Sequence, residues 1–209
     1  MDVQIRLIQT LDSVRQVGSV NQRWIFCPWL ERFSRDTGIW ISVLAAHDAN
    51  GALFDALVGS RKSLPDVYAA VFMVDPFRSA GEIICRIKQS GVGGVINCPS
   101  ISFIDGAAGA TFDKLSLGIE RELEFLSGCA AAGLRVAGLV RTVAAAERLL
   151  AIGADFLVAH GGPPTASDGD PSIEAVRRIG GAERASHVPI VPLSFIVRPD
   201  DVRRGSGVA

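Results

Sequence analysis

Short apolar runs alternate along this chain with longer segments in which apolar residues recur at helical spacing. The short runs are almost continuously apolar, which is typical of parallel strands that are buried on both faces. This pattern predicts six strands, over Trp24–Pro28, Val67–Met73, Gly94–Cys98, Arg135–Val140, Phe156–Ala159 and Pro189–Leu193.

The longer segments predict helices, several of them with recognisable ends. Thr142 is a favourable N-cap, Pro171 suits a first helical turn, and Gly91 follows the last apolar position of its segment. These residue types mark helix termini in proteins generally. The predicted helices are Val3–Val17, Ala49–Val58, Ser79–Ser90, Asp113–Ala132, Thr142–Ile152 and Pro171–Ile179.

Strands and helices alternate often enough to predict βαβ units and a parallel sheet with right-handed crossovers. Two architectures are compatible with this order, a TIM-type (β/α) barrel and an open doubly wound sheet. A complete eight-unit barrel takes about 250 residues, whereas this chain has 209. We therefore expect one α/β domain over residues 1–209, with an N-terminal helix in 1–23 and the repeated units in 24–200.

The composition excludes several classes of partner. Lys and Arg number 21 and Asp and Glu 22, so the net charge is −1, and no long basic run is present. This balance argues against a nucleic-acid partner. No apolar stretch reaches the ~18 residues of a membrane span, and the N-terminus lacks the apolar core of a signal peptide. We expect a cytoplasmic protein that binds neither nucleic acid nor a membrane.

The cysteines indicate no metal site. All four are scattered, and no C-x-x-C pair occurs among Cys27, Cys85, Cys98 and Cys129. Scattered cysteines of this kind favour free, buried thiols over a zinc site or a disulfide framework. Cys98 directly follows Asn97 at a predicted strand end, where packing is also its expected role.

In either architecture, functional residues lie just past the carboxyl ends of the strands. His160 ends an apolar strand and precedes Gly161 and Gly162, so an imidazole stands beside backbone that a ligand can approach. An imidazole in such a place suits general acid–base catalysis or metal binding. The other candidates at strand ends or before a helix are Asp48, Asn50, Asp75, Asn97 and Arg141.

Several of these residues also have a purely structural interpretation. Asp75, which precedes Pro76, can cap the following helix, and Asn97 can form a turn. Arg141 can bind a carboxylate or a phosphate through both of its terminal nitrogens, or it can cover the barrel rim. Together the candidates outline a site for a small polar or anionic ligand, and they identify no reaction by themselves.

Three motifs, in order along the chain, resemble those of one known family. They are Asp75-Pro76-Phe77-Arg78, Gly94-Val95-Ile96-Asn97-Cys98-Pro99-Ser100 and Ile104-Asp105-Gly106. The chain resembles the phosphoenolpyruvate hydrolase-like family, TIM-barrel proteins of the phosphoenolpyruvate/pyruvate superfamily, from about residue 24 to residue 200. The resemblance implies a hydrolase or lyase that acts on a small 2-oxo or enol-phosphate carboxylic acid, with Mg²⁺ as the cofactor.

The resemblance also implies roles for the candidates. Asp75 would be the metal-linked carboxylate, His160 the proton-transfer residue and Asn97 the group that orients a substrate oxygen. In a metal-assisted reaction of this class, the cation stabilises an enolate-like oxygen. The substrate-binding set would be Asp48, Asn50, Arg141, Gly161 and Gly162.

The chain departs from the family at both ends. The resemblance implies a first strand with a glycine-rich loop, but the residues before 24 have the spacing of a helix. The expected fold is therefore an incomplete barrel that lacks its first and last strands, with Trp24–Pro28 and Pro189–Leu193 as free edges. Apolar edges left open in this way predict self-association into a homo-oligomer.

Two other functions stay open. The chain could be a catalytically inactive remnant that senses a ligand or assembles with a partner, because the glycine-rich loop that would bind an anion is not recognised. It could also be an open nucleotide-binding sheet, although no G-x-G-x-x-G follows a first strand and no P-loop occurs. Schiff-base chemistry is not expected, since Lys62, Lys88 and Lys114 lie away from the strand ends.

Overall fold

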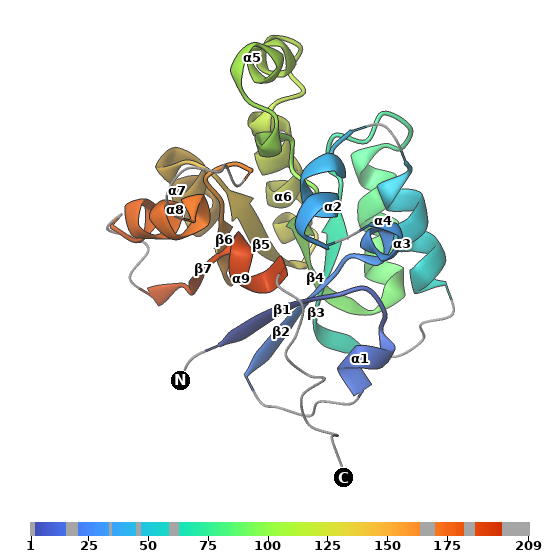
Figure 1. Ribbon diagram of the computed structural model, residues 1–209. Helices are drawn as coiled ribbons and strands as arrows, with labels where there is room; N and C mark the ends of the chain where they lie inside the picture. Colours follow the sequence, from blue (N-terminus) through green and yellow to red (C-terminus); the bar gives the residue numbers. More distant parts are fainter. Residues whose placement is uncertain are drawn as a thin grey trace.

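A computed structural model describes residues 3–15, 21–33, 35–44, 47–58, 63–163, 170–181 and 187–197. Seven parallel strands lie side by side in the order in which they occur in the sequence, with helices alternating around them (Figure 1). They form a nearly closed α/β barrel, so the predicted TIM-type fold is confirmed. The strands are β1 (Gln4–Ile8), β2 (Gln22–Phe26), β3 (Leu64–Val71), β4 (Val92–Asn97), β5 (Arg135–Val140), β6 (Leu157–Ala159) and β7 (Ile190–Pro192).

Several helices begin where the sequence supplies a capping oxygen. The side chains of Asp48, Ser79 and Thr142 each accept a backbone N–H in the first turn of the helix that follows. Within the described ranges, no helix is long and apolar enough to cross a membrane. The helical segments are α1 (Asp12–Arg15), η1 (Pro28–Arg32), α2 (Arg35–Ile41), α3 (Ala49–Leu57), α4 (Ala80–Ser90), η2 (Ile101–Phe103), α5 (Gly106–Lys114), α6 (Ile119–Ala131), α7 (Val143–Ala151), α8 (Pro171–Gly180) and α9 (Leu193–Val197).

The prediction of an N-terminal helix at Val3–Val17, and of a missing first strand, was wrong. The segment begins with β1, which pairs in parallel with β2 in the register Gln4 to Gln22. Ile5 and Leu7 point into the barrel interior, a spacing of two residues that the helical pattern had concealed. Residues 16–20 lie outside the described ranges, as do residues 198–209, and no eighth strand occurs among the residues that are described.

The gap in the barrel therefore lies between β1 and β7, the two ends of the sheet. The prediction that Trp24–Pro28 forms a free edge was wrong, because β2 pairs with β1 on one side and with β3 on the other. Helix α9 contacts both β1 and β7, and its residues Leu193 and Ile196 are buried. A segment of the same chain thus contacts both strands that border the gap, and self-association stays a prediction.

The core has two layers, one inside the barrel and one between the strands and the outer helices. Alternate strand residues point to opposite faces, so Ile96 packs inside the barrel and Val95 outside it. Tyr68 is the largest fully buried side chain, and it lies in the interior layer. A Cβ atom on Gly94 would stand 2.6 Å from the Tyr68 ring, so glycine is required there.

The predicted helix Asp113–Ala132 is in fact two helices, α5 and α6, and α5 begins before the predicted start. Ser116, between them, has a φ of 57°, a left-handed conformation that ends α5 and redirects the chain. None of the α5 residues is buried, and the helix projects from the barrel at the top of Figure 1. Its position beside the carboxyl ends of the strands brings it next to the site.

Candidate functional site

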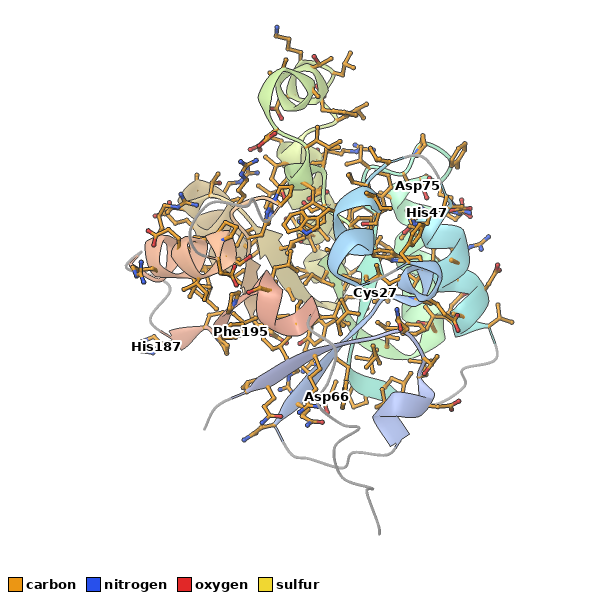
Figure 2. The ribbon with its side chains drawn as sticks, viewed as in Figure 1. Cys27, His47, Asp66, Asp75, His187 and Phe195 are labelled. Atoms are coloured by element: carbon orange, nitrogen blue, oxygen red, sulfur yellow. The ribbon has the colours of Figure 1, made fainter. Side chains whose placement is uncertain are left out.

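Four of the candidate residues lie at the same end of the barrel, just past β3, β4, β5 and β6. Figure 2 places Asp75 toward the upper end of the molecule, while Asp66, near the start of β3, lies at the lower end. Asp75, Asn97, Arg141 and His160 each stand at or after the last residue of their strand. The structure divides them between two hydrogen-bonded groups and one pocket.

The first group, here named the Arg78 cluster, consists of Asp48, Asn50, Asp75 and Arg78. Asp75 Oδ2 accepts hydrogen bonds from Asn50 Nδ2 at 2.8 Å and from Arg78 Nη1 at 3.0 Å. Asp75 Oδ1 accepts the backbone N–H groups of Phe77 at 2.7 Å and of Arg78 at 3.2 Å. Both oxygens of a carboxylate that is only 4% exposed are thus fully engaged.

Asp48 completes this cluster from the start of α3. Its two oxygens accept from Arg78 Nη1 at 2.9 Å and from Nη2 at 2.5 Å, and Oδ1 also accepts the Gly51 N–H. The hydrogen bond from Arg78 holds the pKa of Asp48 below its ordinary value. Asn50 joins the cluster to the strand end, because it pairs with both the N–H and the C=O of Phe72. The cluster fastens α3 to the end of β3.

The Arg78 cluster does not fit the expected Mg²⁺ site. A divalent cation at Asp75 would have to displace the Arg78 guanidinium, which already forms ion pairs with both carboxylates. Mg²⁺ also takes oxygen ligands in near-octahedral geometry. No group of three or more His, Cys, Asp or Glu side chains gathers as a possible metal site in the part of the chain that the structure describes.

The second group is built around Glu122, a residue of α6 that is completely buried. Glu122 Oε2 accepts from Asn97 Nδ2 at 2.7 Å and from Ser100 Oγ at 2.7 Å, and Oε1 accepts the Ile101 N–H at 2.6 Å. These three partners are all neutral. Burial accordingly raises the pKa of Glu122 to about 7, although the hydrogen bonds act in the opposite direction.

Asn97 connects this carboxyl to the sheet. Its Nδ2 also donates to the Leu139 carbonyl at 3.0 Å, and its Oδ1 accepts the Leu139 N–H at 2.7 Å. The Asn97 amide therefore bridges the ends of β4 and β5 and has no exposed surface. These contacts explain why an asparagine stands at position 97: it holds the Glu122 carboxyl group and joins β4 to β5.

Two serines link Glu122 to His160. Ser100 Oγ lies 2.7 Å from Ser102 Oγ, and Ser102 Oγ lies 2.9 Å from His160 Nε2. We name the series Glu122–Ser100–Ser102–His160 the Glu122 chain. Within the described residues it shares no hydrogen bond with the Arg78 cluster. Asn97 and His160 thus belong to one network, and Asp75 belongs to the other.

His160 is fully buried at the mouth of the barrel. Its ring makes edge contacts with Phe103, at 4.9 Å between centroids, and with Trp40, at 5.8 Å. Nδ1 is buried and has no hydrogen-bond partner among the residues that the structure describes. Burial, with a smaller contribution from the positive charge of Arg141, lowers the pKa of His160 to about 3, so the imidazole is neutral at ordinary pH.

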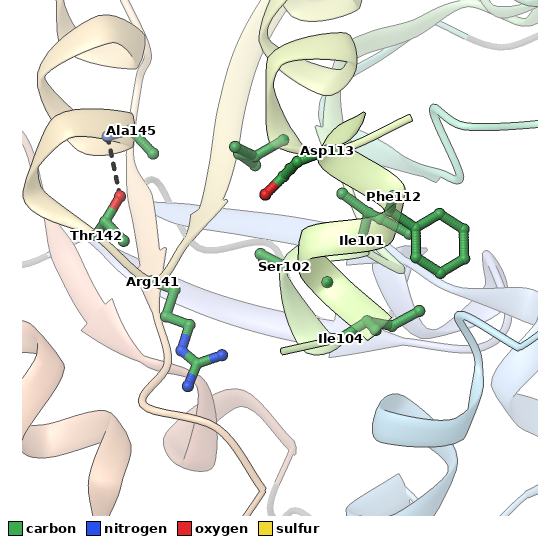
Figure 3. A pocket seen from close by; sticks show the side chains of 11 residues that line it. Ile101, Ser102, Ile104, Phe112, Asp113, Arg141, Thr142 and Ala145 are labelled. Carbon is green, nitrogen blue, oxygen red and sulfur yellow. Dashed lines mark hydrogen bonds between the residues drawn. The ribbon is translucent and has the colours of Figure 1, made fainter. Parts of the chain in front are cut away.

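A pocket of about 150 Å³ lies beside the Glu122 chain, between η2, α5 and the start of α7. Ser102 and Arg141 both line it, and Figure 3 shows the guanidinium of Arg141 at its edge, with the Thr142 side chain capping α7. Arg141 Nη2 is 2.9 Å from Asp105 Oδ2, which is 62% exposed. An anion that enters the pocket can therefore displace Asp105 and pair with the Arg141 guanidinium.

The two glycines after His160 have different reasons to be glycine. A Cβ on Gly161 would stand 2.3 Å from the Pro171 carbonyl, so close packing against α8 requires it. Gly162 has a φ of +113°, and the nearest atom to an added Cβ would be Arg141 Nη2 at 4.0 Å. Gly162 is buried, and its positive φ is the reason for glycine at this position.

Sequence reasoning missed Glu122, Ser100 and Ser102. The signal was present for Glu122, because it occupies a position between Ile119 and Leu126 on the apolar face of α6. A carboxyl at a core position of a helix is rare unless it is paired. For the serines, only their place directly after a strand end pointed to the site.

The remaining candidates lie elsewhere. Cys98 is buried in the interior layer, where it packs as an apolar residue, and His187 is exposed. His47 contacts the rings of Trp29 and Phe33. Among the described residues, none of the three joins either hydrogen-bonded group.

Residues 34–179 match a protein family that is described as "Phosphoenolpyruvate hydrolase-like". In Sinorhizobium fredii (strain NBRC 101917 / NGR234), "Uncharacterized protein y4oT" is 31% identical over 133 residues, which are 64% of this chain and 68% of that protein. From the same organism, "Putative transcriptional regulatory protein y4pA" is 32% identical over 120 residues, 56% of this chain but only 19% of that longer protein.

Proposed function

Because the chain belongs to the phosphoenolpyruvate hydrolase-like family, we propose that it is an enzyme that cleaves or hydrolyses a small 2-oxo or enol-phosphate carboxylic acid. The observation that carries the proposal is the meeting of a cation, a hydroxyl and an imidazole at the carboxyl ends of β4, β5 and β6. Arg141 and Ser102 line the pocket, and His160 is bonded to Ser102. In parallel α/β barrels, active sites lie at this end.

Each of the three groups has a task that its surroundings support. Arg141 binds the carboxylate or phosphate of the substrate in place of Asp105, since a guanidinium pairs with either anion through two nitrogens. Ser102 can accept a hydrogen bond from a protonated substrate oxygen. His160 transfers a proton, because the neutral ring has one nitrogen without a proton, which can accept one when the other nitrogen passes its own proton on.

Help from Mg²⁺, and the role of Asp75 as its ligand, remain proposals that the surroundings of Asp75 do not favour. When bound, the cation would stabilise negative charge on a substrate oxygen. We assign no step to it. The experiment below therefore includes it as a separate condition.

The test is a thermal-shift screen of phosphoenolpyruvate, pyruvate and oxaloacetate, each with and without Mg²⁺, followed by assays of turnover. A ligand that binds only the folded state raises the unfolding midpoint. We expect at least one acid to raise it in the wild type and to fail in Arg141→Ala. An unchanged midpoint with every acid, at millimolar concentration, would contradict the proposal.

A second function is favoured by one comparison. The region similar to this chain makes up 19% of "Putative transcriptional regulatory protein y4pA". A domain in that setting can sense a small acid without converting it. If the chain is such a sensor, the acid raises the midpoint but is recovered unchanged after prolonged incubation, whereas the enzyme consumes it.

Self-association and a cytoplasmic location also belong to the proposal. One feature disfavours self-association through strand pairing: β7, at the end of the sheet, is short and contains Pro192, so it offers little backbone for pairing with another chain. Sedimentation at micromolar concentration tests the oligomer directly. A strictly monomeric, well-folded species would show that α9 alone is sufficient to close the barrel.

A further inference from the structure

We propose that the Glu122 chain is a proton path: His160 accepts a proton at Nδ1, and the two serines pass a proton on from Nε2 to the buried carboxylate of Glu122. In this view Glu122 is the store for the proton and never contacts the substrate. The inference rests on the proposed function only for the source of the proton. The path itself is a property of the free protein.

The distances make the path continuous. The links are 2.9 Å from His160 Nε2 to Ser102 Oγ, 2.7 Å from Ser102 Oγ to Ser100 Oγ, and 2.7 Å from Ser100 Oγ to Glu122 Oε2. Each lies within the ordinary range for a hydrogen bond that involves a hydroxyl group. No water is needed to bridge any of the three steps.

Each serine has a single hydroxyl proton, and this fixes the direction of every hydrogen bond in the Glu122 chain when Glu122 is ionised. An ionised carboxylate only accepts, so Ser100 must give its single hydroxyl proton to Glu122. Ser100 then has none left for Ser102, and Ser102 must donate to Ser100. Ser102 in turn can only accept from His160, which therefore carries its proton on Nε2 and presents a bare lone pair at Nδ1. The absence of a partner for Nδ1 agrees with this assignment.

The transfer balances without any co-reactant. A proton binds to His160 Nδ1, the Nε2–H proton moves to Ser102 Oγ, the Ser102 proton moves to Ser100 Oγ, and the Ser100 proton moves to Glu122 Oε2. At the end both serines are again neutral hydroxyls and His160 is again neutral, now with its proton on Nδ1. Only Glu122 has changed its charge, from carboxylate to carboxylic acid.

The charges around the two ends favour this division of labour. Arg141 is the charged group that faces His160, and it disfavours a second positive charge on the imidazole. Glu122 faces the neutral Asn97 amide, the Ser100 hydroxyl and the Ile101 N–H, and no cation in the described part of the chain pairs with it. An imidazole that resists becoming charged is thus joined to a carboxylate that readily accepts a proton.

Nitrogen-15 NMR of the labelled full chain, without any ligand, tests the path. The chain has 3 histidines, and the variant His160→Gln identifies the His160 signals. We expect His160 to carry its proton on Nε2 at pH 9 and on Nδ1 at pH 5, and to be neutral at both. The midpoint of this tautomer change should follow the pKa of Glu122, about 7.

Two variants break the path at different points. Ser102→Ala removes the central hydroxyl of a partly exposed residue, and Glu122→Gln removes the ionisable end. Both should abolish the change of tautomer near pH 7. Ser102→Thr keeps the hydroxyl and should preserve it, and the exposed α6 substitutions Ser127→Ala and Glu124→Gln are matched controls. If Glu122→Gln does not fold, the Ser102 pair still decides.

Two results would overturn the path. One is an imidazole that charges fully with a midpoint near 6.5, the ordinary histidine value. The other is a tautomer change that persists unaltered in Ser102→Ala. Neither result bears on whether the pocket binds an acid. Conversely, failure of every acid in the thermal-shift screen would leave the tautomer result standing, so the two proposals fail separately.

Discussion

The Arg78 cluster and the Glu122 chain both place a buried carboxyl group at the carboxyl end of a strand, yet their partners differ in charge. Asp75 accepts four hydrogen bonds, one of them from the guanidinium of Arg78. Glu122 accepts three, all from neutral groups. The first carboxylate is compensated, and the second is held in a place where ionisation is costly.

This difference separates a structural task from a chemical one. A compensated carboxylate has both oxygens occupied by hydrogen bonds, so it stabilises the connection between two elements. An uncompensated one exchanges a proton near neutral pH, and groups with perturbed pKa values of this kind cluster at functional sites. Location at the carboxyl end of a strand therefore marks a region of the barrel, and the charge of the neighbours indicates which residues there take part in chemistry.

The largest effect should come from His160→Gln, which removes the imidazole at the end of the Glu122 chain. Loss of a proton-transfer group lowers turnover by roughly 10²–10⁴-fold, and we expect this loss in an assay with the acid that the binding screen identifies. His187→Gln changes an exposed imidazole and is the control. Full turnover in His160→Gln would exclude the assigned role.

Asp75→Asn should act on stability. The change removes the charge that pairs with Arg78 inside a nearly buried site, so we expect the free energy of unfolding to fall by about 3 kcal/mol, measured by denaturant titration. Asp48→Asn, at a side chain that is 47% exposed, should cost about 1 kcal/mol or less. An Asp75→Asn protein of normal stability that loses only Mg²⁺-dependent turnover would instead establish Asp75 as a metal ligand.

The dependence of stability on pH should differ between variants at the two ends of the Glu122 chain. The folded pKa of Glu122 is raised from 4.5 to about 7, so the stability that its protonated form contributes is lost as the pH rises through that interval. The folded pKa of His160 is lowered from 6.5 to about 3, so the stability that its neutral form contributes is lost as the pH falls. Between pH 4.5 and 6.5 the two effects oppose each other in the wild type.

Single substitutions should uncover each effect. Relative to the wild type, Glu122→Gln should gain stability with rising pH in this interval, and His160→Gln should lose it. We expect a change on the order of 2 kcal/mol over two pH units in each case, measured by denaturant titration at each pH. Parallel pH profiles for all three proteins would show that neither group titrates as described.

The smallest effect should come from Arg141→Lys. A lysine keeps the charge but offers no planar pair of donors to a carboxylate or phosphate, so we expect binding of the acid to weaken by about tenfold. Arg148→Lys, at an exposed arginine of α7 that pairs with Glu120, is the matched control. Equal affinities for wild type and Arg141→Lys, measured by titration calorimetry, would remove Arg141 from the binding site.

The sequence was sufficient to predict the barrel because most strands are continuously apolar and most helices carry strong caps. Arg135–Val140 was predicted residue for residue. The failures have local causes. β1 carries polar residues at Gln4 and Arg6, so its apolar residues also fit a helix, and only pairing with β2 selects the strand. The break at Ser116 depends on a left-handed backbone that a serine seldom adopts.

The position of the candidate site could be predicted from the sequence, but the hydrogen-bond partners of its residues could be predicted less well. The strand-end rule located Asp75, Asn97, Arg141 and His160 correctly, because it depends only on the order of strands. Asp75 and Arg78 are only three residues apart, but the pairing of Arg78 with Asp48 and of Asn97 with Glu122 joins segments that are distant in the sequence. Glu122 lies 25 residues from Asn97, and no local pattern connects the two.

The short helix α9 has a consequence for how the chain folds. Every strand pairs with its neighbour in sequence, so each unit can add to the one before it while the chain is being made, with only local loops to close. The contacts of α9 with β1 and with α2 differ, since they join segments near the two ends of the described chain. Closure of the barrel is therefore a non-local event in assembly, and it cannot take place until α9 has been synthesised.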